Sequence, residues 1–302
     1  MSTRMQLPAT VLLAALAVGA CSATGSGGAA SPSSASAPGA TAAPSVVEGI
    51  AHPTGASDVV LRLDESGGFV PVEFLAAHVP QFTLYGDGTV VFVSSSEVLP
   101  ERSDGVITGQ PLKTATLTEA QVQDLLEYAL RDGGLGAARA DYQNPLVADA
   151  PTAVFTLNAD GATKTVSVVA LGMDDPQPNT DTAIKKALGE LGSRLRDFDA
   201  GGSLGGTPYQ AAAYEGVLTA QDGLEGVQVR DWPWTDLTPA DFTAPNDPNA
   251  LPQGRAILTP EQAAALGVEG YENGIGGGVY LRDDEGKTYT FSLRPVLPDA
   301  AE

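Results

Sequence analysis

A run of small, uncharged residues near the N-terminus most restricts what this 302-residue chain can fold into. Residues 22–45 contain only Ser, Ala, Thr, Gly and Pro. Such a segment has no large apolar side chain to bury, so it cannot offset the entropy that is lost when a backbone is ordered. We expect a flexible tether with a root-mean-square reach of about 25 to 30 Å. The folded part must begin after it.

The residues before the tether have the pattern of an export signal. One positive charge, Arg4, precedes an uncharged, mostly apolar stretch from Leu7 to Ala20, which small residues close. This stretch is too short to span a bilayer. Residues 1–20 are therefore predicted to be a signal peptide.

Cys21 is the only cysteine and directly follows the small residues of the predicted cleavage site. This arrangement resembles the bacterial lipoprotein signal, in which the cysteine becomes the mature N-terminus and carries the lipid. A thiolate can take up a diacylglyceryl group as a thioether, and several acyl chains, palmitate among them, make a durable anchor. The resemblance implies that residues 21–50 are a lipidated N-terminus and tether on the extracytoplasmic side of the cell membrane. The alternative is an ordinary secretory signal followed by a chance cysteine.

The charge balance argues against several classes of function. The chain has 16 Lys and Arg against 37 Asp and Glu, a formal net charge of −21. It has no basic footprint for nucleic acid, and an anionic membrane surface would repel it. One cysteine cannot form an internal disulfide or a multi-thiolate metal site. Removal of the leader takes away only Arg4 among the charges, which leaves 15 basic and 37 acidic residues, a net charge of −22, and residues 22–45 carry none of it.

From Asp58 onward the hydrophobic pattern alternates between strand and helix periods. Alternating apolar residues predict a strand at Val59–Leu63. Turns rich in Asp and Gly predict β-hairpins over residues 82–92, 153–171 and 279–294. Hairpins imply antiparallel pairing.

Capping patterns predict the helices between these hairpins. Thr118 and Gln121 have the spacing of a capping box before an apolar stripe, and a second amphipathic helix is expected over residues 182–198. Short helices are expected after Thr238-Pro239 and Thr259-Pro260. The expected fold is α+β, an antiparallel sheet of β-hairpins with two main amphipathic helices packed on it and irregular Pro-rich loops.

A glycine-rich stretch at residues 201–206 is the plausible internal boundary. It separates an α+β domain at 51–200 from a smaller β-rich part at 207–302, which can belong to the same domain. Residues 231–254 contain several prolines and are expected to be an irregular surface loop.

Four runs of the folded part resemble a family of uncharacterised lipid-anchored or secreted proteins from high-GC bacteria: residues 67–74, 80–90, 150–157 and 293–299. The similarity covers most of the chain after the tether. The stretch 211–228 and the glycine-rich run before Val279 depart from the family. The resemblance implies an extracytoplasmic location and no particular activity.

Residues suited to catalysis are few apart from the acids. The chain has two histidines, His52 and His78, and neither a Gly-x-Ser-x-Gly elbow nor a His-x-x-x-His pair. We expect both histidines to be structural or at the surface. Acidic pairs are common enough for a paired-carboxylate hydrolase, but we expect them to be turn residues and solvated faces; the pairs are Asp64-Glu65, Asp174-Asp175 and Asp283-Asp284.

Two further segments have residue types that could bind a ligand. Residues Asp174–Asp181 could wrap a calcium ion, but they lack the ligand spacing and central Gly of an EF-hand loop. The alternative is an acidic loop in which Asp181 or Thr180 caps the second helix. Gly274–Gly278 lead into a strand and do not open a helix, so a turn or bulge explains them better than a phosphate cradle.

Trp232 and Trp234 flank Pro233 in a predicted loop between acidic residues. Two exposed indoles there could stack on a sugar ring or anchor a partner. The alternative is that one or both rings pack into the core beneath the loop. Tyr85, next to a hairpin tip, has the same two interpretations. These three are the candidate partner-binding residues.

These features together predict a non-enzymatic binding or interaction module of the cell envelope. It would have no cofactor, would be anchored through Cys21, and would bind an envelope protein or a glycan but no nucleic acid. The alternative is a hydrolase of envelope polymers that uses an acidic residue pair. A third hypothesis is stability that depends on calcium.

Overall fold

The computed structural model describes residues 49–69, 75–95, 106–144, 147–173, 179–200, 205–221, 228–244, 253–268 and 274–300. The predicted signal peptide, Cys21, nearly all of the tether and Asp174-Asp175 lie outside these ranges. The described residues group as one compact unit.

A first sheet has the strand order β4-β3-β2-β1-β6-β7-β5. Its neighbouring strands pair antiparallel, except that the short β5 runs parallel to β7. Asp160 and Gly161 join β6 to β7, and both have the positive φ that a tight hairpin turn needs. The strands are β1 (Val59–Gly67), β2 (Phe82–Tyr85), β3 (Thr89–Val93), β4 (Ile107–Thr116), β5 (Asp141–Tyr142), β6 (Pro151–Ala159) and β7 (Ala162–Val169), with β8 (Thr207–Pro208) paired to β4.

The last third of the chain forms a second sheet in the order β11-β9-β13-β12. The two sheets share β4, whose N-terminal half pairs with β12 and whose C-terminal half pairs with β3. A further short strand, β10, runs parallel to β12. The strands are β9 (Tyr214–Gln221), β10 (Val229–Asp231), β11 (Gly254–Leu258), β12 (Gly274–Arg282) and β13 (Thr288–Pro295).

The helices begin where capping side chains satisfy their first amides. Thr118 and Gln121 have the reciprocal bonds of a capping box at α2 (Glu119–Leu130), and Thr259 and Gln262 have them at α4 (Pro260–Ala264). The third helix, α3 (Thr182–Arg196), ends two residues before the predicted end. Short 3-10 turns are η1 (Pro239–Asp241) and η2 (Pro298–Ala300).

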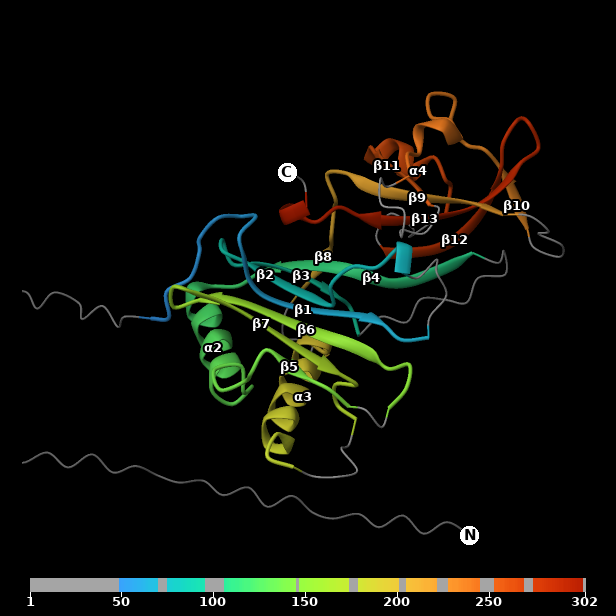
Figure 1. Ribbon diagram of the computed structural model, residues 1–302. Helices are drawn as coiled ribbons and strands as arrows, with labels where there is room; N and C mark the ends of the chain where they lie inside the picture. The colour runs from blue at the N-terminus through green and yellow to red at the C-terminus, as the bar shows by residue number, and fades with distance from the viewer. Residues whose placement is uncertain are drawn as a thin grey trace, which may run out of the picture. The chain divides into compact units, whose positions relative to one another are not determined.

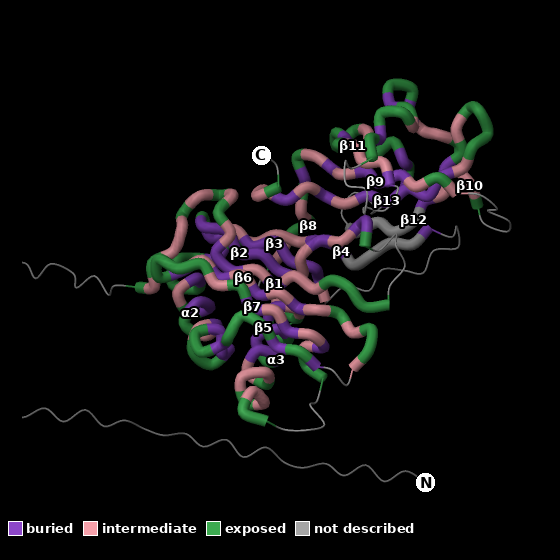
Figure 2. The backbone as a smooth tube through the Cα atoms, viewed as in Figure 1, coloured by how far each residue is buried: buried purple, intermediate pink, exposed green. Residues whose placement is uncertain are grey.

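Helices α2 and α3 lie on one face of the first sheet (Figure 1). Their apolar stripes and the facing strands form one buried cluster, which includes Leu126, Leu191, Phe82, Phe92 and Phe155. A second cluster lies between the second sheet, α4 and the segment after β10. Figure 2 shows both as buried stretches of the tube, with exposed residues mainly in the connections. The α+β class is thus confirmed.

The short helix expected after Thr238-Pro239 is present as a single 3-10 turn, with Thr238 as its N-cap. The structure corrects two other local expectations. The described part of 231–254 is not a surface loop throughout, because Phe242 is buried in the second core. The strand β12 begins already at Gly274, and register shifts along its glycines show the irregular pairing that was expected there.

Within the described residues, no helix is both long enough and apolar enough to cross a membrane.

The C-terminal turn η2 is held on the first sheet by a carboxylate. Asp299 Oδ1 accepts hydrogen bonds from Arg62 Nη2 and from the Tyr85 hydroxyl, each at 2.7 Å. Burial alone raises the pKa of the Asp299 carboxyl, but the bonds from Arg62 and Tyr85 outweigh burial and hold that pKa below its usual value.

This contact predicts a loss of stability in acid. The pKa of Asp299 is lower in the folded than in the unfolded chain. The ionised Asp299 therefore contributes fully to the free energy of unfolding above the unfolded pKa of about 3.9. This contribution is lost as the pH falls through the folded pKa. Asp299→Ala should lower the free energy of unfolding at pH 7 by about 2 kcal/mol, and Tyr85→Phe by about 1 kcal/mol. Urea titrations at pH 7 and pH 3 measure both, and an unchanged pH dependence in Asp299→Ala would contradict the assignment.

Candidate functional site

The two tryptophans belong to the second core, so the interpretation in which the rings pack beneath the loop is the one that the structure supports. Trp234 is 6% exposed and its Nε1 donates to the Gln262 carbonyl at 2.8 Å. Trp232 is half-buried, its Nε1 donates to the Leu237 carbonyl at 2.6 Å, and its ring centroid lies 5.0 Å from that of Trp234. Edge-to-face packing of this kind is typical of a core. The surface that partner binding would need is largely covered.

Tyr85 is likewise part of the structure. Its side chain is fully buried and its hydroxyl donates to Asp299. Burial and this bond raise the pKa of the hydroxyl. The position next to a hairpin tip suggested exposure, but the C-terminal turn η2 bonds to this residue from the far end of the sequence.

Both histidines and the described acidic pairs have structural partners. His52 Nε2 lies 3.2 Å from Glu119 Oε1, and His78 Nε2 lies 2.5 Å from Asp64 Oδ1. Glu65 accepts two bonds from the Arg196 guanidinium, at 2.6 and 2.7 Å. These contacts join segments that are far apart in the sequence.

Asp283 closes the turn between β12 and β13. Its Oδ1 accepts from the amides of Glu285 and Lys287 at 3.1 and 2.8 Å, which is the turn role expected for the Asp283-Asp284 pair. Of the calcium candidate Asp174–Asp181, the described end shows Asp181 at the N-terminus of α3, bound to Arg139 at 2.5 Å and giving no side-chain cap bond.

Hydrogen bonds hold the pKa of five described carboxyl groups below the usual value, so these five do not suit the role of a general acid. They are Glu119, Asp241, Glu261, Asp283 and Asp299. A carboxylic acid that protonates a leaving group needs a raised pKa. In the same residues no group of three or more His, Cys, Asp or Glu side chains is placed to share a metal ion.

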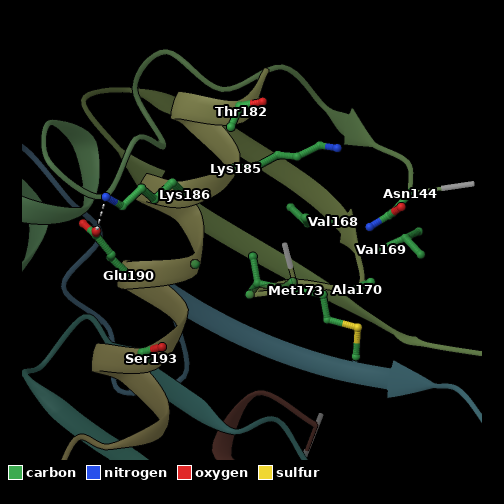
Figure 3. A pocket seen from close by; sticks show the side chains of 13 residues that line it. Asn144, Val168, Val169, Ala170, Met173, Thr182, Lys185, Lys186, Glu190 and Ser193 are labelled. Atoms are coloured by element: carbon green, nitrogen blue, oxygen red, sulfur yellow. Dashed lines mark ion pairs between the residues drawn. The ribbon is translucent and has the colours of Figure 1, made fainter. Parts of the chain in front are cut away.

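A cavity of about 480 Å³ lies between α3 and the C-terminal end of β7 (Figure 3). This volume is within the usual range for small-molecule sites. One wall is apolar and comes from the end of β7 and the turn after it, with Val168, Ala170, Leu171 and Met173. The facing wall is α3, with Thr182, Lys185, Gly189 and Ser193, and Asn144 closes one side.

Backbone geometry at the end of β7 opens this space. Ala170 and Gly172 both have positive φ, so the chain turns sharply where the strand ends. On α3, Gly189 has no side chain where a Cβ would lie 3.6 Å from the Gly172 Cα, and this leaves room beside the turn. One turn along, a Cβ on Gly192 would lie 2.6 Å from Leu171 Cδ2. Gly192 therefore permits a close approach to Leu171, and Gly189 lines the cavity without adding a side chain to it.

The charges around the cavity are unusual for so acidic a chain. Its ionisable lining residues are Lys185, Lys186 and Glu190. Figure 3 shows Lys185 extending over the cavity toward Asn144, whereas Lys186 and Glu190 pair with each other on the other side of α3, with an N–O distance of 3.8 Å. Lys185 Nζ also donates to the Gln143 carbonyl at 3.3 Å. The arrangement suits binding, because it combines an apolar wall with one cation and several hydrogen-bonding groups.

None of the cavity residues was a candidate from the sequence. The one available signal was the pair of glycines at 189 and 192 in an otherwise regular helix, and it indicated only a weakened helix. The cavity depends on how the end of β7 meets α3, which is a tertiary feature.

A glycine-to-alanine pair tests this geometry. Gly189→Ala should raise the free energy of unfolding by about 0.5 to 1 kcal/mol, because Ala favours the helix and its Cβ meets only ordinary contacts. Gly192→Ala, the matched control, should give no gain, since Leu171 would have to move. Urea denaturation measures both. An equal increase in the free energy of unfolding for Gly189→Ala and Gly192→Ala would contradict the described packing.

No family model matches the chain, and no curated protein or solved structure matches it either.

Proposed function

We propose that the chain is a lipid-anchored extracytoplasmic binding protein, held by acyl chains on Cys21, with no catalytic role. Its antiparallel sheet of β-hairpins, with amphipathic helices packed on one face, would be a rigid scaffold for the cavity beside α3. The proposed relationship to the uncharacterised lipid-anchored family of high-GC bacteria is in keeping with such a role. The single observation that carries the binding function is the cavity with its apolar wall and lysine.

The position of the cavity also favours this proposal. The chain enters the folded part beside the β6–β7 turn, where Asp160 N donates to the Ala51 carbonyl at 2.6 Å. The cavity lies at the other end of β7, and seven residue steps of about 3.3 Å separate Ala162 from Val169, or about 23 Å. A ligand could therefore enter at the end of the sheet remote from the tether attachment (Figure 1).

The engagement of the acidic pairs counts against the hydrolase alternative. Asp64 and Glu65 are bound to His78 and Arg196, and Asp283 is bound within its turn. Each of these carboxylates thus already has a role in holding the fold together.

Blocking the cavity tests the binding function. The wild-type chain and Gly189→Leu would each be incubated with fractionated envelope extract and analysed by native mass spectrometry. We expect small molecules to be retained by the wild type and lost from Gly189→Leu, whose side chain fills the space. Retention by both, or by neither, would show that the cavity is not a binding site. Circular dichroism would confirm that the variant is folded.

The anchor has its own test. Cys21→Ser should abolish lipidation, because the hydroxyl lacks the nucleophilicity of a thiolate. Mass spectrometry of the mature wild-type N-terminus is expected to show a diacylglyceryl group on Cys21, and the variant should lose its membrane association. An unmodified Cys21, or wild-type protein free in the medium, would contradict the anchor.

A further inference from the structure

We propose that the cavity beside α3 takes an amphipathic anion, an acyl or alkyl chain with one carboxylate or phosphate group. This inference rests on the proposed binding function and names the class of ligand. It comes from two features of the lining, an apolar wall on the β7 side and a cation on the α3 side.

The apolar wall suits a hydrocarbon chain. Val168 and Ala170 are buried, and Leu171 and Met173 continue the wall outward, with Met173 53% exposed at the rim. Methionine is flexible and polarizable, so it adapts to chains of different shape. Each methylene that leaves water for such a wall should tighten binding about four-fold. Affinity should therefore rise steeply with chain length until the cavity is filled.

The cation selects the head group. Lys185 extends over the cavity in Figure 3, and its Nζ donates a hydrogen bond to the Gln143 carbonyl at 3.3 Å. An ammonium group has three donors on a flexible stem, so it can contact an anion in addition to its protein partners. Thr182 and Ser193 add hydroxyl groups to the same helix wall. The long-range field of a chain with net charge −21 disfavours anions, so selection for an anion here must come from local contacts with Lys185.

The test uses a matched series of probes on the full-length chain carrying Cys21→Ser to prevent lipidation. Octanoate, decanoate, decanol, decylammonium and decyl phosphate would be titrated by isothermal calorimetry. We expect decanoate to bind about fifteen-fold more tightly than octanoate, for two further buried methylenes. It should bind about ten-fold more tightly than decanol, because only the anion gains a charge-assisted bond. The ratio of the affinities for decyl phosphate and decanoate distinguishes a lipid phosphate from a free fatty acid as the source of the head group.

Three variants separate the chain from the head group. Lys185→Gln should lower the affinity for decanoate about ten-fold and leave the affinity for decanol unchanged. Lys164→Gln removes the same charge from the far end of β7, where its amine bonds the Gly136 carbonyl, and should change neither. Gly189→Leu should abolish binding of both probes.

The outcomes distinguish the ligand class from the function. Three results would overturn the proposal of an amphipathic anion but leave the cavity as a binding site. They are equal affinity for decanoate and decanol, a preference for decylammonium, and an unchanged affinity for decanoate in Lys185→Gln. Failure of every probe to bind would also overturn the ligand class, while the envelope-extract experiment still decides the function. Unchanged decanoate binding in Gly189→Leu would place the probe elsewhere and count against both.

Discussion

Replacing Asp199 by Ala is expected to lower the free energy of unfolding by about 3 to 5 kcal/mol. Asp199 follows α3 and is 5% exposed. Its carboxylate accepts from Ser94 Oγ at 2.6 Å and from the Ser95 amide and hydroxyl at 3.1 and 3.2 Å, and it lies 3.6 Å from Lys113 Nζ. Without the carboxylate, the partly buried Lys113 on β4 loses one ion-pair partner, and the Ser94 and Ser95 side chains lose this acceptor.

Urea denaturation of matched variants measures this effect. Asp197→Ala removes an exposed acid two residues earlier and should change stability by less than about 0.5 kcal/mol. Asp199→Asn keeps a hydrogen-bond acceptor but not the charge, so its free energy of unfolding should lie between those of Asp197→Ala and Asp199→Ala. Similar stabilities for Asp197→Ala and Asp199→Ala would show that the buried cluster does not hold α3 to the sheet.

Trp234→Ala should cost about 3 to 5 kcal/mol, because it removes a large ring from the second core. Its ring centroid lies 5.3 Å from that of Phe291 and 5.0 Å from that of Trp232, and its Nε1 donates to the Gln262 carbonyl. The change would leave a cavity and an acceptor without its donor. Thermal and urea unfolding of the second sheet would both report the loss.

The control for Trp234 is an aromatic residue at the surface. Phe69 is 93% exposed, and Phe69→Ala should change stability by less than about 0.5 kcal/mol. If Trp234→Ala were as mild as Phe69→Ala, the indole would not be a core residue. Its use as a partner contact would then become the better interpretation.

Local signals in the sequence predicted where several elements begin and turn. Thr118 and Gln121 form the capping box that their spacing indicated, because capping involves only neighbouring residues. Asp160 and Gly161 adopt positive φ between β6 and β7 for the same reason. Such features depend on a few adjacent residues, so the sequence alone carries the information.

Features that depend on distant residues could not be predicted. The strand β4 contains Pro111 and has no clear alternation, yet it is central because β3 and β12 pair with its two halves. The acids and prolines around Trp232 and Trp234 suggested a surface loop, but Phe242 and Phe291 bury the indoles from other segments. The cavity arises in the same way, from the meeting of α3 with the turn after β7.

The shared strand β4 has a consequence for how this gene could be divided. The glycine-rich stretch at 201–206 invites expression of residues 51–200 as a separate fragment. That fragment would lack β12, so the N-terminal half of β4 would present unpaired amides and carbonyls along an open edge. Open edges of this kind recruit further copies of a chain. Soluble recombinant protein should therefore require both halves in one polypeptide.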